Sequence, residues 1–262
     1  MMKKTKRNLT IASIIIVIII MLSQRNTKPS FNFPECEEEI IINSNITFYI
    51  DNNIDNKEEL KRRLQEAVNM SNTILSNSCI PITRVFKESH SVSISHDRMS
   101  ISSVHSDLKQ AVGSSKINSF LDDPKEQYVL VLSDNHPLVI KEGINGMTMV
   151  NLNDSFVLLA ESFPIAVLEH ELGHLGWAMH ERPNSESGDF WIIEQVFAKN
   201  RSKVKPYSGA FHCSNYGTVM SYSEKVVPAY SSPLVSNNGE PCGNEEYADN
   251  ARVMREYAKT LQ

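Results

Sequence analysis

The eleven residues from His170 to His180, HELGHLGWAMH, constrain this chain more than any other segment. His170 and His174 are four residues apart, so on a helix their rings lie on one face, about 6 Å apart along the axis. Glu171 lies on the neighbouring face, and His180 follows the helix. Three imidazoles with this spacing are typical ligands of a zinc ion. The segment therefore predicts a metal site built on a helix.

This ligand set predicts a particular chemistry. Three histidines fill three positions of a tetrahedral zinc ion and leave the fourth for water, whose pKa the metal lowers to roughly 7. The Glu171 carboxylate is placed to take a proton from that water and later hand one to a leaving amine. We expect peptide-bond hydrolysis, with His170, His174 and His180 binding one zinc ion. Glu171 is then the general base and acid, and Glu181 is the alternative third ligand.

A second motif lies downstream, at Tyr216 to Tyr222 (YGTVMSY). Taken alone, these residues are typical of an ordinary turn with a core methionine. After an extended HExxHxxxxxH segment they resemble the methionine turn of the metzincin zinc peptidases. The resemblance implies that Met220 lies beneath the metal ligands and supports them. It also implies that Tyr222 occupies the place of a tyrosine that binds the metal or stabilises the oxyanion.

The resemblance extends towards the C-terminus, where the sequence is similar to the tail of bacterial reprolysin-like metzincins. It implies a loop rich in proline and glycine along one wall of the substrate cleft, followed by a final helix. It covers residues 125–262, and residues 45–125 only by the order of elements. The matching segments are Ser231–Pro233 (SSP), Asn238–Gly243 (NGEPCG) and Ala248–Arg252 (ADNAR).

The metzincin resemblance also implies an edge strand above the cleft, which binds the substrate backbone by strand addition. Residues 147–151 occupy its place, with Met147, Thr148 and Met149 as the substrate-contacting residues. An ordinary edge strand without this role is the alternative.

One position departs from the family pattern. Metzincins have glycine three residues after the second histidine, where this chain has Trp177, and the glycine here is Gly176. Glycine just past a helix end commonly adopts a left-handed conformation. We therefore expect Gly176 to end the helix in that conformation, with one extra residue in the turn before His180.

The order of apolar segments predicts the fold class. Residues 46–50, 82–95, 128–132 and 156–159 have the composition of strands, and residues 56–76 and 104–120 have the apolar periodicity of helices, the second interrupted near Gly113. This order predicts an α+β fold: a twisted mixed sheet of about five strands with helices, the active-site helix below it and a small C-terminal subdomain.

The N-terminus has the pattern of a targeting segment. Four basic residues between Lys3 and Arg7 precede an apolar run from Leu9 to Leu22. No small-x-small cleavage site follows, so we expect residues 1–23 to be an uncleaved signal anchor, with a cleaved signal peptide as the alternative. Residues 24–44 are then a tether and residues 45–262 the zinc peptidase domain. The domain is expected outside the cytoplasm, anchored in the membrane or secreted.

Four cysteines agree with an exported protein: Cys36, Cys79, Cys213 and Cys242. An even count in an oxidising compartment suggests two disulfides, for which sequence alone allows three connectivities. We favour Cys36 with Cys79 and Cys213 with Cys242, because each pair would link one half of the domain.

Charge narrows the range of partners. The formal net charge is -5, which argues against nucleic-acid binding as the main function. We expect a monomer with a protein or peptide substrate, attached to the membrane through its N-terminal segment. Two alternatives stay open: an exported binding domain that has lost activity, and a zinc amidase acting on cell-wall material.

Overall fold

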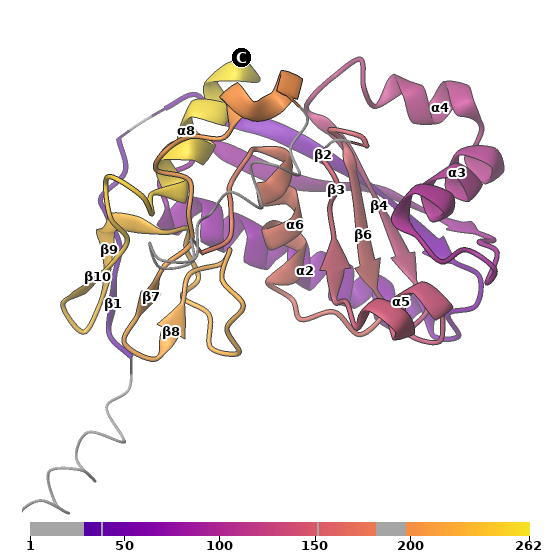
Figure 1. The fold of residues 1–262 in the computed structure, drawn as a ribbon, viewed down its shortest axis with the longest axis horizontal. Helices are drawn as coiled ribbons and strands as arrows, with labels where there is room; N and C mark the ends of the chain where they lie inside the picture. Colours follow the sequence, from indigo (N-terminus) through magenta and orange to yellow (C-terminus); the bar gives the residue numbers. More distant parts are fainter. Residues whose placement is uncertain (1–28, 38, 151, 182–197) are drawn as a thin grey trace, which may run out of the picture. The chain divides into compact units, whose positions relative to one another are not determined.

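The computed structural model describes residues 29–37, 39–150, 152–181 and 198–262 (Figure 1). The segment predicted as a signal anchor or signal peptide, residues 1–23, therefore lies outside the described residues, as does position 151 of the expected edge strand. The chain divides into two compact units, residues 1–31 and 32–262, and the second contains the histidine motif. Among the described helices, none has the length and hydropathy needed to span a membrane.

A five-stranded mixed sheet forms the centre of this second unit. Its strand order is β3-β2-β4-β6-β5, in which the first four strands are parallel and β5 pairs with β6 in the antiparallel direction. The predicted α+β fold with a five-stranded mixed sheet is confirmed. The strands are β2 (Ile42–Asp51), β3 (Ile82–Val92), β4 (Glu126–Leu132), β5 (Gly146–Met147) and β6 (Phe156–Ala160).

One face of the sheet carries the helix with the histidine motif. Helices α2 (Lys57–Asn77) and α6 (Val167–Leu175) lie side by side against this face. Alternate residues of the strands, such as Phe48, Val131 and Leu159, pack against leucines of both helices, such as Leu64 and Leu172. This apolar layer holds α6 against the sheet. The predicted helix at residues 56–76 agrees with α2 to within a residue at each end.

The opposite face of the sheet is also covered. Helices α3 (Ile101–Val112), α4 (Ser114–Ser119) and α5 (Pro137–Glu142) pack on it through residues such as Val104 and Leu138. The break between α3 and α4 falls at Gly113, whose φ of 101° few other residues adopt. Burial on both faces explains why residues 128–132 form a continuous apolar run.

The edge strand is shorter than the sequence predicts. β5 contains Gly146 and Met147 only, so Thr148 and Met149 lie outside it. The chain turns here because the backbone carbonyl of Met149 accepts hydrogen bonds from the amides of Leu152 and Asn153, at 2.8 and 3.2 Å. The hydrogen bonds of this turn outweigh the strand propensity of residues 147–149.

The C-terminal part of the chain packs against the C-terminal end of α6. A third apolar cluster joins Met220, Tyr230 and Met254 to Ile74 and Leu75 at the end of α2. The elements of the C-terminal part are η1 (Ala198–Lys203), β7 (His212–Cys213), β8 (Tyr216–Gly217), β9 (Ser232–Asn237), β10 (Glu240–Cys242) and α8 (Asn250–Thr260). At the other end of the described chain, the two-residue strand β1 (Phe31–Asn32) spans the sequence boundary of the two units.

Both disulfides have the connectivity favoured from sequence. Cys36 is bonded to Cys79, just past the end of α2, and Cys213 of β7 is bonded to Cys242 of β10. The first bond fixes residue 36, within the stretch that the sequence predicts as a tether, to the compact unit. The second closes the loop that contains the residue 216–222 motif.

Removing the second disulfide tests its contribution to stability. The bond closes a loop with a sequence separation of 29, and loop-closure entropy for such a loop stabilises the folded state by about 3 to 4 kcal/mol. The Cys213→Ser/Cys242→Ser protein should lose about this much free energy of unfolding in urea titrations. An unchanged free energy of unfolding would show that the cross-link does not constrain the unfolded chain.

Candidate metal centre

The three predicted histidines converge. The Nε2 atom of His180 lies 2.9 Å from Nε2 of His170 and 3.0 Å from Nε2 of His174. All three residues together offer ligand atoms within 4.8 Å of one another. Among the described residues this is the group that could hold a metal ion.

The other ring nitrogen of each histidine, Nδ1, also has a hydrogen-bond partner. Nδ1 of His170 lies 2.8 Å from the carbonyl oxygen of Val219, and Nδ1 of His174 lies 2.9 Å from that of Ala178. A carbonyl oxygen only accepts, so both Nδ1 atoms carry the proton and both Nε2 atoms present a lone pair. His180 Nδ1 contacts the Tyr222 hydroxyl at 3.1 Å.

This arrangement of protons fits a cation. The lone pairs on Nε2 of His170 and of His174 both face Nε2 of His180, and a single proton on that nitrogen can satisfy only one of them, whereas a cation among the three nitrogens satisfies all of them. Backbone partners on Nδ1 are the usual second layer around metal-binding histidines, because they fix the tautomer and the ring orientation. The donor chemistry of the group therefore matches a metal site.

Burial keeps the rings unprotonated. It lowers the pKa of His170, although the hydrogen bond to Val219 acts in the opposite direction. The pKa of His174 lies well below its ordinary value because of burial and then the two neighbouring imidazoles. Burial, followed by the charge of His170, lowers the pKa of His180 to about 3. Neutral imidazole is the form that binds a metal ion.

Helix α6 is short and depends on its packing. It has nine residues and its N-cap, Ala166, makes no side-chain capping bond, so its intrinsic stability is small. Leu168, Leu172 and Leu175 are buried in the core. These leucines occupy one side of the helix, so the histidines four residues apart are turned towards the cleft.

The end of α6 differs from the sequence-based expectation. Gly176 has a φ of -86° and is not left-handed, whereas Trp177 has a φ of 69°. The Trp177 amide donates to the His174 carbonyl and the Ala178 amide to the Gly173 carbonyl, both at 3.0 Å. This is a Schellman ending with tryptophan at the left-handed position. Trp177 therefore takes the left-handed conformation that the sequence predicted for Gly176, and the turn carries no extra residue.

Gly176 serves a different purpose. A Cβ atom built on it would lie 2.5 Å from the sulfur of Met254 and 3.0 Å from the Tyr257 ring. Glycine at this position therefore lets α8 approach the end of α6 closely. The expectation of a left-handed Gly176 was wrong because a glycine next to a helix end is also selected by packing.

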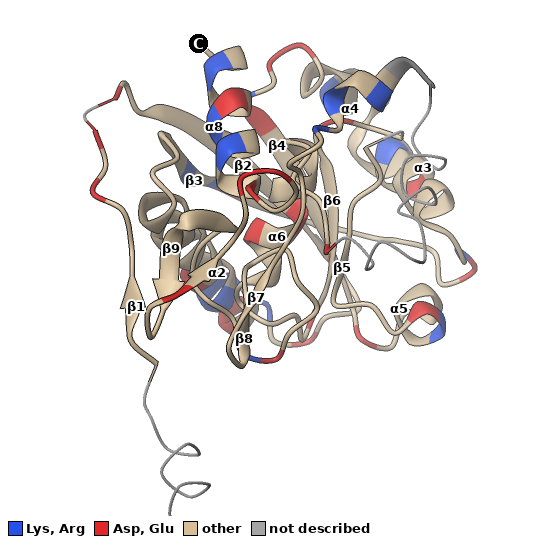
Figure 2. Cartoon of the chain, turned by 60° about the vertical axis from the view of Figure 1, so that its left-hand side comes forward, with Lys and Arg blue, Asp and Glu red and all other residues tan. Residues whose placement is uncertain are grey.

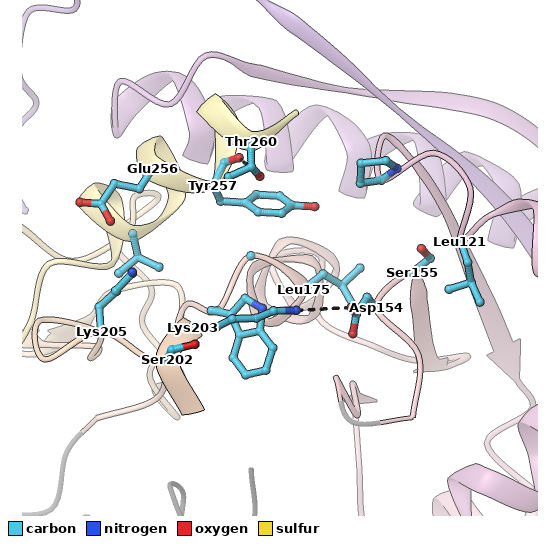
Figure 3. Close-up of a pocket in the computed structure, with 14 residues that line it drawn as sticks. Leu121, Asp154, Ser155, Leu175, Ser202, Lys203, Lys205, Glu256, Tyr257 and Thr260 are labelled. Atoms are coloured by element: carbon cyan, nitrogen blue, oxygen red, sulfur yellow. Dashed lines mark hydrogen bonds and ion pairs between the residues drawn. The ribbon is translucent and has the colours of Figure 1, made fainter. Parts of the chain in front are cut away.

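Trp177 is held by its surroundings. Its side chain is buried against Val253 of α8, and the Lys203 ammonium lies over its ring, 5.1 Å from the centroid. The tryptophan also lines a cavity of about 620 Å³. Figure 3 shows the ion pair of Lys203 with Asp154 in this cavity and the ring of Tyr257 extending across it. These contacts offset the cost of a left-handed tryptophan.

The methionine turn contributes both backbone and side chain. The Ser221 amide donates to the Thr218 carbonyl at 2.8 Å and closes the turn. Val219 in this turn supplies the carbonyl that holds His170. Met220 is fully buried, and its sulfur would lie 2.8 Å from a Cβ on Gly173. The glycine inside the histidine motif thus makes room for the methionine.

Glu171 is buried beside the three histidines, next to β5. Burial raises the pKa of Glu171 to about 8, while the hydroxyl of Thr148 acts in the opposite direction. A Cβ atom on Gly146 of β5 would lie 2.8 Å from Oε1 of Glu171, so glycine lets the carboxyl rest against the strand. Figure 2, which colours acidic residues red, shows β5 passing beside α6.

A cleft of about 680 Å³ contains the histidines and Glu171. Met147 and Thr148 line it on the β5 side and Tyr222 on the side of the methionine turn, whereas Met149 does not. The hydroxyl of Thr148 donates to the backbone carbonyl of Glu171 at 3.1 Å. Tyr222 is 81% exposed, so its ring covers the mouth of the site rather than filling the core.

The alternative third ligand is directed elsewhere. A carboxylate oxygen of Glu181 lies 3.2 Å from Nε2 of His212, and the convergent group contains His180 instead. The lone histidine near the methionine turn, His212, thus acquires a partner that its sequence position does not reveal.

No protein-family model matches the chain, and no curated protein matches it. Among solved structures it is similar to a chain from a chaperone-substrate complex, with a TM-score of 0.59 and 17% sequence identity. The match covers 84% of this chain and 34% of that one. At this identity the similarity concerns the fold alone, and this chain spans only about a third of its neighbour.

Two substitutions at position 177 test the left-handed turn. Trp177→Ala and Trp177→Gly both remove the indole, but only alanine keeps a Cβ at a φ of 69°. The glycine protein should therefore be the more stable of the two by about 1 kcal/mol. Free energies of unfolding from urea titrations measure the difference, and a more stable alanine protein would contradict the assigned turn.

The lowered histidine pKa values predict a pH dependence for the metal-free protein. Below pH 6.5 the unfolded chain takes up protons that the folded rings do not, so the free energy of unfolding should fall between pH 6.5 and about 3. The raised pKa of Glu171 gives the opposite slope between about 8 and 4.5. Comparing the parent with His180→Ala isolates the contribution of His180.

The His180→Ala protein should show the shallower loss on acidification. Urea unfolding of both chelator-treated proteins at several pH values between 7 and 4 measures it. Equal slopes in the two proteins would mean that His180 is protonated as readily in the folded state as in the unfolded state.

Proposed function

We propose that this protein is a zinc-dependent endopeptidase. The observation that carries the proposal is the convergence of three Nε2 atoms, each with its Nδ1 held, beside one buried carboxyl group in an open cleft. Three neutral imidazoles with room for a fourth ligand are typical of catalytic zinc sites, whereas structural sites are closed by four protein ligands.

The spacing of the nitrogens supports zinc as the ion. Tetrahedral zinc with bonds of about 2.05 Å places its nitrogen ligands roughly 3.3 Å apart. The two short Nε2 separations, 2.9 and 3.0 Å, are slightly smaller, so a small outward movement of the rings accommodates the ion. When bound there, zinc supplies an activated water and polarises the substrate carbonyl.

Two side chains, Glu171 and Tyr222, then have separate roles in the hydrolysis. Glu171 takes the proton of the attacking water and passes it to the leaving amine. Its pKa of about 8 refers to the site without a cation, and a neighbouring divalent ion favours the carboxylate form. Tyr222, at the mouth of the cleft, has a hydroxyl placed to leave His180 and donate to the developing oxyanion.

The edge of the sheet provides a binding mode for an extended substrate. β5 is the last strand of the sheet and runs along the cleft, so a peptide can add to its free edge by backbone hydrogen bonds. Met147 and Thr148 lie where this peptide would pass, whereas Met149 lies outside the cleft lining. This geometry favours a peptide over a compact small molecule.

The metzincin resemblance supports the same assignment. The extended histidine motif and the methionine turn occur in the family order, and the left-handed residue at position 177 matches the place of the family glycine. We propose membership of the bacterial reprolysin-like metzincins. We also propose that the N-terminal segment carries the domain across the membrane, as an anchor or as a cleaved signal peptide, and that a monomer acts on exported or surface proteins.

A Glu171→Gln protein tests the role of the carboxyl group. The amide keeps the shape but cannot take a proton, so cleavage of casein should fall by about 10²- to 10⁴-fold while zinc binding is retained. Zinc content and peptide products are measured on the same full-length preparation. Parent-like cleavage by this variant refutes the role of Glu171, and glycan-derived products without peptide cleavage support a cell-wall amidase instead.

A further inference from the structure

A buried ion pair lies directly behind the histidine helix. Arg84 of β3 contacts both carboxylate oxygens of Glu169, from Nε and from Nη2, each at 3.1 Å. Both side chains are buried, with exposures of 1% and 0%. Glu169 is the residue before His170, so this pair is attached to the helix at its first metal ligand.

The arginine is itself fixed on every side. Its Nη1 donates to the Ser44 hydroxyl of β2 at 2.8 Å, and Ser44 in turn contacts Gln127 of β4. The Asn72 side chain of α2 holds the backbone of Arg84 through two hydrogen bonds of 2.7 and 3.0 Å. The guanidinium group is therefore a rigid reference point built from three strands and a helix.

Tyr230 completes the network from the C-terminal part. Its hydroxyl donates to Oε1 of Glu169 at 2.8 Å and lies 3.2 Å from the Glu169 carbonyl. A Cβ on Gly173 would lie 2.7 Å from this hydroxyl, so the tyrosine reaches Glu169 only because residue 173 is glycine. The two carboxylate oxygens thus have three bonds to fixed donors.

Helix α6 has a specific need for such an anchor. Its N-terminal end lacks a side-chain cap, and a nine-residue helix can rotate or fray at that end. Successive residues are about 100° apart around a helix. Fixing Glu169 towards Arg84 therefore fixes the direction of His170 towards the cleft.

We propose that Arg84, Glu169 and Tyr230 are positioning residues of the metal centre, which set the rotation of α6 and so the direction of its two histidine ligands. The proposal rests on the proposed zinc site. A purely stabilising role is a poor explanation, because buried ion pairs often add little stability compared with an apolar pair of similar volume. Tyr230 also lies close to the methionine turn, since Val219 donates to the carbonyl of Ala229 at 3.0 Å.

The chain offers a matched control for Tyr230. Tyr128 is equally buried, and its hydroxyl also has two partners, His105 at 2.8 Å and Asn153 at 2.9 Å. It lies on the opposite face of the sheet, in the cluster that does not include α6. Tyr230→Phe and Tyr128→Phe thus remove the same buried group at comparable cost, but only the first touches the network.

The experiment measures zinc affinity by chelator competition, and the visible spectrum of the cobalt-substituted protein, in the full chain. Tyr230→Phe should weaken zinc binding about tenfold and alter the cobalt spectrum, while Tyr128→Phe leaves both unchanged. The double variant Arg84→Met/Glu169→Met removes both charges together, so no unpaired charge remains buried. It should fold, with weakened zinc binding and an altered cobalt spectrum.

The outcomes separate the two proposals. Parent-like zinc affinity and cobalt spectrum in both Tyr230→Phe and the double variant would overturn the positioning role while leaving the zinc site intact. Equal losses in Tyr230→Phe and Tyr128→Phe would also overturn it, since the effect would then follow general stability. A parent protein that binds no zinc would overturn the proposed function itself.

Discussion

The orientation of three imidazole rings is the constraint on which the rest of the site depends. Two backbone carbonyls, from Val219 and Ala178, accept from Nδ1 and leave Nε2 free to bind a cation. Those carbonyls come from the methionine turn and from the turn that ends α6. The fold therefore prepares the site through backbone positions, which tolerate changes in side chain better than side-chain partners do.

Several unusual local features have a common explanation in this requirement. Gly173 admits the sulfur of Met220 and the hydroxyl of Tyr230, and Gly176 admits α8. Trp177 adopts a left-handed backbone conformation, so the chain reverses direction directly after α6 and brings His180 next to the other two rings. Each feature stabilises one short helix from a different side. Packing and hydrogen bonds together compensate for the missing side-chain cap at its start.

The sequence predicts the regular parts of the structure well. Long periodic segments such as α2, and the buried strand at residues 128–132, follow from hydrophobic pattern alone. The pairing of His170 with His174 follows from helical spacing, and the extended motif adds His180, which lies beyond the helix. The conformation of Trp177 does not, because left-handed residues other than glycine leave no pattern. The pairing of Arg84 with Glu169 is equally hidden, since only the folded sheet brings positions 85 residues apart into contact.

The most direct test of the metal centre is X-ray absorption at the zinc edge of the full-length protein loaded with one equivalent of zinc. We expect about four light ligands near 2.0 Å, with the outer-shell scattering of three imidazoles and no sulfur. A spectrum with the scattering of fewer imidazoles, or with sulfur ligands, would contradict the convergence of His170, His174 and His180 around one ion.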